Sequence, residues 1–143
     1  MSELTLFIPG IPKAQPRARA TSRGGRFTRM YDPGTAEAWK GCIALAIRDH
    51  MPAAPMDGPV RVDLTFLLPR PKRLMRKRDP DGAMYCTAKP DRDNLDKAVL
   101  DCLTEMGMWR DDAQVVDGRL RKMYAPKDGR TGVELRITQL ENE

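Results

Sequence analysis

The chain has 143 residues, of which 41% are hydrophobic and 31% charged, and its net charge is +5. This length suits a single domain over 1–143, and the positive charge favours a polyanionic partner. Because the chain has no run of about 18 apolar residues and its N-terminus lacks the features of a secretory signal, we expect a cytoplasmic protein without a membrane span.

The first part of the sequence predicts a strand, a loop and a helix. Residues 4–8 are apolar and β-favouring, which predicts a short strand. A loop over 11–31 follows. The pair Asp32-Pro33 is typical of a helix N-cap followed by proline in the first turn, and we expect this helix to end near His50. The apolar stripe expected on the helix consists of Ala36, Trp39, Ile43, Ala46 and Ile47.

The second part predicts one further helix and three strands. Residues 60–66 alternate between apolar and polar, as in a half-buried strand. A helical stripe over 91–106 ends at Gly107, a residue favoured just past a helix C-terminus. Residues 113–124 and 132–140 are expected to pair as a C-terminal hairpin. The order β-α-β-α-β-β predicts an α+β fold, with a mixed sheet and two main helices packed on it.

Two segments concentrate positive charge. The loop over 11–31 contains no acid, and 70–78 packs six cations into nine residues. Each segment is either a solvated surface or a grip for DNA phosphates. We favour the second reading because unopposed positive charge repels itself without an anionic partner. The candidate DNA-binding residues are Lys13, Arg17, Arg19, Arg23, Arg26, Arg29, Arg70, Lys72, Arg73, Arg76, Lys77, Arg78 and Lys89.

An acidic segment lies within this basic chain. Residues 91–118 contain eight acids and three bases, a charge of −5, so the remainder of the chain carries +10. A polyanion would be repelled by the acidic segment unless a cation were bound there. A divalent metal ion is the obvious candidate.

Each acid also has a simpler interpretation. Asp91 and Asp93 lie where the second helix should begin, where aspartate commonly caps the helix or interacts with its dipole. Lys97 could form an ordinary ion pair with Asp93, four residues earlier. The pair Asp111-Asp112 could consist of turn residues.

The combination favours a metal site. The second helix should be about 22 Å long, and the chain must return from it to the sheet. Two carboxylates at the start of one element and a third at the start of another commonly converge on a hard cation. We therefore expect Asp91, Asp93 and Asp112 to bind Mg²⁺, with Asp111 in support. Lys97 could then bridge a carboxylate and the phosphate that is cut.

The cysteines and the histidine exclude other kinds of site. Cys42, Cys86 and Cys102 are odd in number and have no paired spacing, so we expect free thiols, two of them on helix faces. His50 is the only histidine. A single histidine excludes a zinc site with several histidine ligands and disfavours a Ser-His-Asp or Cys-His enzyme.

The acidic segment also carries a family pattern. Residues 89–97 read Lys-Pro-Asp-Arg-Asp-Asn-Leu-Asp-Lys, and 98–103 read Ala-Val-Leu-Asp-Cys-Leu. Residues 107–116 then read Gly-Met-Trp-Arg-Asp-Asp-Ala-Gln-Val-Val. This composite resembles the RusA family of Holliday junction resolvases. Weaker similarity extends to the first strand and the C-terminal strands.

The resemblance implies a homodimer with a RusA-like fold that binds four-way DNA junctions and makes paired, symmetric nicks. It implies Mg²⁺ or Mn²⁺ as the cofactor, with no organic cofactor. The essential acids of the family fall on Asp91, Asp93 and Asp112, and its essential lysine falls on Lys97. Attack in line with the leaving 3′ oxygen would give a 5′-phosphate and a 3′-hydroxyl. Phage or prophage origin and a role in DNA recombination and repair are plausible.

Three other functions stay open from the sequence. One is a metal-dependent nuclease for flaps, single strands or RNA, which substrate comparison would distinguish. A second is a non-catalytic DNA-binding protein, which would bind without Mg²⁺ and make no nicks. The third, a module that binds an acidic protein, fits the acidic segment poorly.

Overall fold

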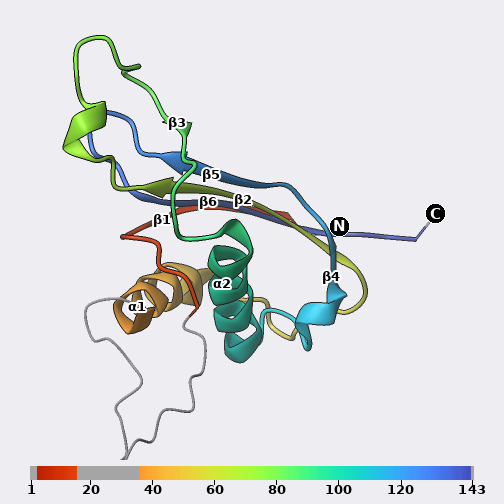
Figure 1. The fold of residues 1–143 in the computed structure, drawn as a ribbon. Coiled ribbons are helices and arrows are strands. Elements are labelled where there is room, and N and C mark those ends of the chain that lie inside the picture. Colours follow the sequence, from red (N-terminus) through yellow and green to blue (C-terminus); the bar gives the residue numbers. More distant parts are fainter. Residues whose placement is uncertain (1–2, 16–35, 143) are drawn as a thin grey trace, which may run out of the picture.

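A mixed β-sheet with both helices on one face forms the core of the molecule (Figure 1). The computed structural model describes residues 3–15 and 36–142. The expected helix start at Asp32-Pro33 lies outside the described residues, as do the candidate DNA-binding residues Arg17, Arg19, Arg23, Arg26 and Arg29.

The described residues form two α-helices and six strands. In order, they are β1 (Glu3–Pro9), α1 (Ala36–Ile47), β2 (Val60–Leu68), β3 (Met84–Tyr85), α2 (Arg92–Met106), β4 (Val115–Asp117), β5 (Leu120–Tyr124) and β6 (Gly132–Gln139). Short 3-10 helices occupy Arg48–His50, Lys72–Leu74 and Asp112–Gln114. The expected single strand over 113–124 is therefore divided into a 3-10 helix and two strands.

The strands lie in the order β1-β6-β2-β5-β3, and β4 also pairs with β2. Strand β2 runs parallel to β4 and β5, whereas the other pairs are antiparallel. The expected mixed sheet with two main helices is confirmed. The expected C-terminal hairpin is wrong, because β2 lies between β5 and β6.

Glycine 118 divides the strand that was expected to be continuous. Its φ is +145°, and a Cβ at this position would lie 1.8 Å from the carbonyl oxygen of Val62. The backbone of this residue therefore approaches β2 too closely for any side chain. As a result, β4 and β5 pair with β2 as two separate strands.

The central strand β2 shows how alternation builds the core. Val62, Leu64 and Phe66 are buried beneath the helices, whereas Arg61 and Asp63 face away and form an ion pair of 3.2 Å. Burial of each large apolar side chain contributes about 1.5–3 kcal/mol. The alternation predicted for this strand is confirmed.

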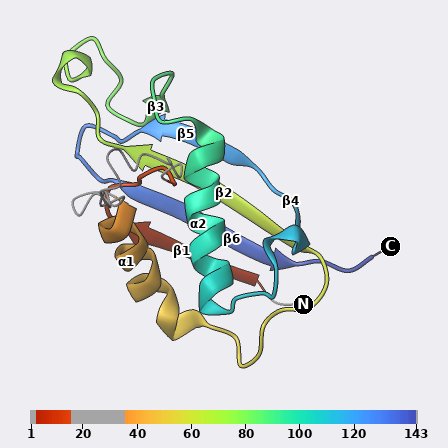
Figure 2. The same cartoon turned by 60° about the horizontal axis from the view of Figure 1, so that its bottom comes forward.

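Helix α2 crosses the same face of the sheet and determines where the acids lie (Figure 2). Leu95, Val99 and Leu103 are completely buried. The helix ends at Gly107, which has a φ of +92° and donates its N–H to the carbonyl of Thr104 at 3.0 Å. The predicted C-terminal glycine is confirmed, and the chain leaves the helix at the end opposite to Asp91.

The cysteines agree with the expectation of free thiols. Cys42, Cys86 and Cys102 are free, and two of them lie on helices as expected. In the described part of the chain, no helix has both the length and the apolar content required to cross a bilayer.

Candidate active site

Asp91 lies immediately before the first turn of α2, with an extended backbone. It occupies the N-cap position, but its side chain accepts no capping hydrogen bond. Its carboxylate instead lies 3.2 Å from Nζ of Lys89 and is about half exposed. Simple helix capping therefore does not explain this acid.

Asp93 lies one residue inside the helix, and its side chain is exposed. One carboxylate oxygen accepts the N–H of Asn94 at 2.9 Å. A negative charge in the first turn is favourable because the helix dipole is positive there. The same location leaves the carboxylate of Asp93 accessible to an approaching ligand.

Lys97 lies one turn further along the same face of α2 as Asp93. Its Nζ lies 3.9 Å from a carboxylate oxygen of Asp101, and its side chain is 60% exposed. The simpler interpretation, an ion pair with Asp93, is therefore not what the structure contains. An exposed pair of this length contributes little stability, so the ammonium group can leave it to contact a phosphate at low cost.

Lys122 holds the segment that precedes Asp91. From β5, its Nζ donates to the carbonyl oxygens of Ala88 at 2.5 Å and Pro90 at 2.8 Å. The sequence analysis assigned this lysine no role, because the contact joins residues more than thirty positions apart. Lys122 is thus a positioning residue for the backbone at Asp91.

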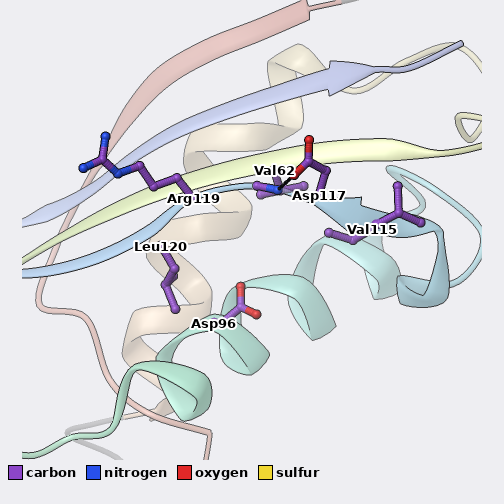
Figure 3. A pocket seen from close by; sticks show the side chains of 8 residues that line it. Val62, Asp96, Val115, Asp117, Arg119 and Leu120 are labelled. Atoms are coloured by element: carbon purple, nitrogen blue, oxygen red, sulfur yellow. Dashed lines mark hydrogen bonds between the residues drawn. The ribbon is translucent and has the colours of Figure 1, made fainter.

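Asp96 is a further acid whose setting the sequence analysis missed. It points from α2 toward the part of β5 that carries Leu120, into a pocket of about 340 Å³ (Figure 3). Burial raises the pKa of its carboxyl, Arg92 lowers it, and the negative charge of Asp93 raises it further. The signal in the sequence was its i+3 spacing from Asp93, which puts the two acids on neighbouring parts of the helix surface.

The second acidic pair lies in the 3-10 helix beyond the other end of α2. Asp111 caps this short helix by accepting the N–H of Ala113 at 2.9 Å. Asp112 is exposed. The capping role explains Asp111 structurally, whereas Asp112 occupies the first helical position.

Gln114 fixes this second acidic segment in place. Its side-chain oxygen accepts the N–H groups of Arg110 at 2.9 Å and Asp111 at 3.1 Å. Its amide nitrogen donates to the carbonyls of Met56 and Gly58, each at 2.9 Å. The residue was part of the family pattern without an assigned role, and the structure identifies it as the side chain that positions Asp112.

The two acidic groups lie at opposite ends of α2 (Figure 2). The helix has 15 residues and is therefore about 22 Å long. Among the residues that the structure describes, no three His, Cys, Asp or Glu side chains are close enough to hold one metal ion. The expectation that Asp91, Asp93 and Asp112 converge within one chain is therefore wrong.

The cause is the path of the chain after α2. Gly107 ends the helix, and Met108 and Trp109 then enter the core beside its last turn. The next element consequently starts at the same end of the molecule. Within one chain, Asp91 and Asp93 supply carboxylate oxygens of the kind that Mg²⁺ prefers, and water and substrate phosphate oxygens commonly complete such a site.

Most of the candidate DNA-binding residues between 70 and 89 lie on the surface. The exposed cations of this region are Lys72, Arg73, Arg76, Lys77, Arg78 and Lys89. Lys13 is half-buried beside Pro90 and Tyr124, with which it lines a pocket. These positions form a basic surface that reaches Asp91 through Lys89.

Arg70 differs from the expectation of a phosphate contact. Its guanidinium donates to the carbonyls of Ala125 at 3.0 Å, Leu74 at 3.1 Å and Pro80 at 2.7 Å, and also to that of Gly82. These bonds direct most of its donors into the protein. Arg70 therefore holds the loop 70–82, which carries the exposed cations, against the end of β5.

The substitution Arg70→Ala is expected to lower the free energy of unfolding by about 2 kcal/mol, because it leaves carbonyls of the loop without their charged donor. Chemical denaturation measures this change. The matched control is Arg78→Ala, an exposed cation of the same loop, for which a change within about 0.5 kcal/mol is expected. Equal effects of the two substitutions would contradict the structural role of Arg70.

Comparison with known proteins identifies a family model and several relatives along most of the chain. The family model described as "Endodeoxyribonuclease RusA" matches residues 9–137. The crossover junction endodeoxyribonuclease RusA of Escherichia coli K12 is 34% identical over 143 residues, which cover 100% of both chains. The protein of the same name from Enterobacteria phage 82 is 34% identical over 115 residues, or 80% of this chain and 81% of the relative. An uncharacterized Bacillus subtilis protein, YqaN, is 34% identical over 130 residues, or 87% and 90%.

These matches first define a class. The sequence, whose fold presents exposed carboxylates at the start of α2 and exposed cations in the loop 70–82, matches a family of enzymes that cut DNA. The chain belongs to the RusA family of endodeoxyribonucleases.

Proposed function

We propose that the protein is a structure-selective endodeoxyribonuclease that resolves four-way (Holliday) junctions by paired symmetric nicks during DNA recombination and repair in the cytoplasm. The observation that carries this proposal is the end-to-end similarity to a crossover junction endodeoxyribonuclease. The exposed Asp91, Asp93 and Lys97 on one end of α2 support it, because they lie next to a basic surface suited to DNA phosphates.

The proposed cofactor is Mg²⁺ or Mn²⁺, and its ligands are Asp91, Asp93 and Asp112. Because Asp112 lies at the far end of α2 in the same chain, the proposed ligand set requires two protomers. In a two-fold homodimer with antiparallel α2 helices, Asp112 of the partner subunit would approach Asp91 and Asp93. The same symmetry would generate two equivalent sites, as two symmetric nicks require.

Each residue then has a separate role. Asp91 and Asp93 would hold the divalent ion at the start of α2. Held there, the ion would supply a water molecule of lowered pKa and neutralise charge on the phosphate. Lys97 is positioned one turn along the helix to contact the phosphate oxygen that gains charge.

The loop 70–82, Lys13 and Lys89 would hold the DNA backbone. Lys13, Lys89 and the exposed cations of the loop 70–82 lie on the same side of the molecule as Asp91. Contacts of this kind recognise the shape of DNA and not its sequence.

Cleavage of a labelled four-way junction tests the proposal. Paired symmetric nicks are expected with Mg²⁺ or Mn²⁺, and loss of cleavage with EDTA. Linear and flapped duplexes of the same sequence are the matched substrates, and much slower cleavage of both is expected. Equal cleavage of flaps would indicate a broader nuclease, and tight binding without any nick would indicate a non-catalytic DNA-binding protein.

A further inference from the structure

A pocket of about 450 Å³ lies beside the first turn of α2. Its apolar wall is formed by Ile11, Pro12, Leu68 and Tyr124, which come from three separate parts of the chain. Pockets of about 300–1,000 Å³ are typical of small-ligand sites. The pocket is thus large enough for a small planar group.

The walls of the pocket are held by hydrogen bonds. The N–H of Gln15 donates to the carbonyl of Asn94 at 3.0 Å, which ties residues 11–15 to α2. The N–H of Ala125 donates to the carbonyl of Leu68 at 2.7 Å. On the third side, Lys122 holds the carbonyl of Pro90 at 2.8 Å. These contacts fix the segments 11–14, 68–69 and 89–90 and the end of β5, which together line the pocket.

The charges around this apolar pocket suit one kind of ligand. Lys13 and Lys89 both line it, and Nζ of Lys89 lies 3.2 Å from a carboxylate oxygen of Asp91. A nucleotide combines a flat, weakly polar base with an anionic phosphate. Bases stack on aromatic and apolar side chains, and lysines contact the phosphates that flank them.

The tyrosine links the pocket to the basic loop. A hydrogen bond to Cys86 and burial raise the pKa of Tyr124, whereas the nearby Arg73 lowers it. The phenol therefore stays neutral at physiological pH. Arg73 belongs to the loop 70–82, so one cation of this loop lies next to the tyrosine of the pocket, and Lys89 links the pocket to Asp91.

We propose that this pocket receives one unstacked base of the bound DNA, next to the phosphate that is cut. The assignment rests on the proposed function, because it requires branched DNA at Asp91. Extruding a base costs a few kcal/mol, and less where the base has lost pairing or stacking partners, so a pocket of this kind would favour a branch point over linear duplex.

A junction with 2-aminopurine at single positions around its branch point tests this assignment. The fluorescence of this base analogue rises when the base leaves the stack. Binding of the wild-type protein in EDTA is expected to raise the fluorescence at one position or its symmetry mate. The variant Ala14→Phe, which fills the pocket, is expected to abolish the rise and to weaken junction binding about tenfold, as for the loss of one stacked base.

The matched control is Ala54→Phe, the same substitution at an exposed alanine that does not line the pocket. It is expected to bind and to raise the fluorescence like the wild type. Ile11→Ser, at a half-exposed position of the wall, provides a second variant with little effect on folding and a reduced rise. A protein that cuts the junction without any rise would overturn the pocket assignment alone, whereas a protein that neither binds nor cuts the junction would overturn both proposals.

Discussion

Nicking is expected to return when the inactive variants Asp93→Asn and Asp112→Asn are combined in one dimer. Each variant alone should cut four-way junctions about a thousandfold more slowly than the wild type, because each site would lose one of the proposed metal ligands. In a mixed dimer whose sites are shared between protomers, one site loses both acids and the other keeps all of them. Junction cleavage by co-refolded, differently tagged chains measures the recovery.

The number of nicks per junction distinguishes a site shared between protomers from a site within one chain. A mixed dimer with one intact site should nick one strand of the junction and should not complete the paired cut. Mixing Asp93→Asn with Asp91→Asn is the matched control, because those acids lie at the same end of α2 and both sites stay defective. If purified mixed dimers of Asp93→Asn and Asp112→Asn show no nicking, the shared site is wrong and a metal site within one chain would need a large rearrangement.

The elements of this fold could be predicted from local patterns, but the pairing of the last strands could not. Period-two alternation located β2, and the stripe ending at Gly107 located α2. The turn before β6 is also real, since the N–H of Gly129 donates to the carbonyl of Pro126 at 2.9 Å. A turn signal, however, does not indicate whether the two strands that it connects are neighbours in the sheet, and here β2 lies between β5 and β6.

The location of the acids shows a similar limit. Sequence spacing correctly put Asp91 and Asp93 at the start of α2 and Asp112 after its end. Convergence of the three within one chain required the chain to return along the helix before Asp112. It returns only after that residue, with β4 and β5, which bring Asp117 and Leu120 beside Asp96. A length of about 22 Å for a 15-residue helix already favours a partner chain as the source of the third acid.

The basic segments show the same difference between what composition predicts and what contacts in the fold determine. Charge alone grouped Arg70 with its neighbours, but its hydrogen bonds to four carbonyls make it part of the framework of the loop. The roles of Gln114 and Lys122 were hidden for the same reason, since their partners lie far away in the sequence. Residues that position a site are recognised by long-range contacts, which no local pattern contains.

Trp109→Ala is expected to lower the free energy of unfolding by about 3–5 kcal/mol, which is enough to unfold a large part of a marginally stable domain. The side chain of Trp109 is only 1% exposed, and its Nε1 donates to the hydroxyl of Thr104 at 2.7 Å. The substitution therefore leaves a cavity beside the last turn of α2 and removes the donor to the hydroxyl of Thr104, which keeps its own hydrogen bond to the carbonyl of Leu100. Chemical denaturation measures the loss.

Two further variants separate packing from hydrogen bonding at this position. Trp109→Phe keeps most of the apolar contact and loses the Nε1 donor, so a smaller loss of about 1–3 kcal/mol is expected. Tyr85→Ala, at a side chain that is 69% exposed, should change stability by no more than about 0.5 kcal/mol. If Trp109→Ala were as mild as Tyr85→Ala, this tryptophan would not anchor the chain that leads to Asp112, and its place in the family pattern would need a direct role in DNA contact.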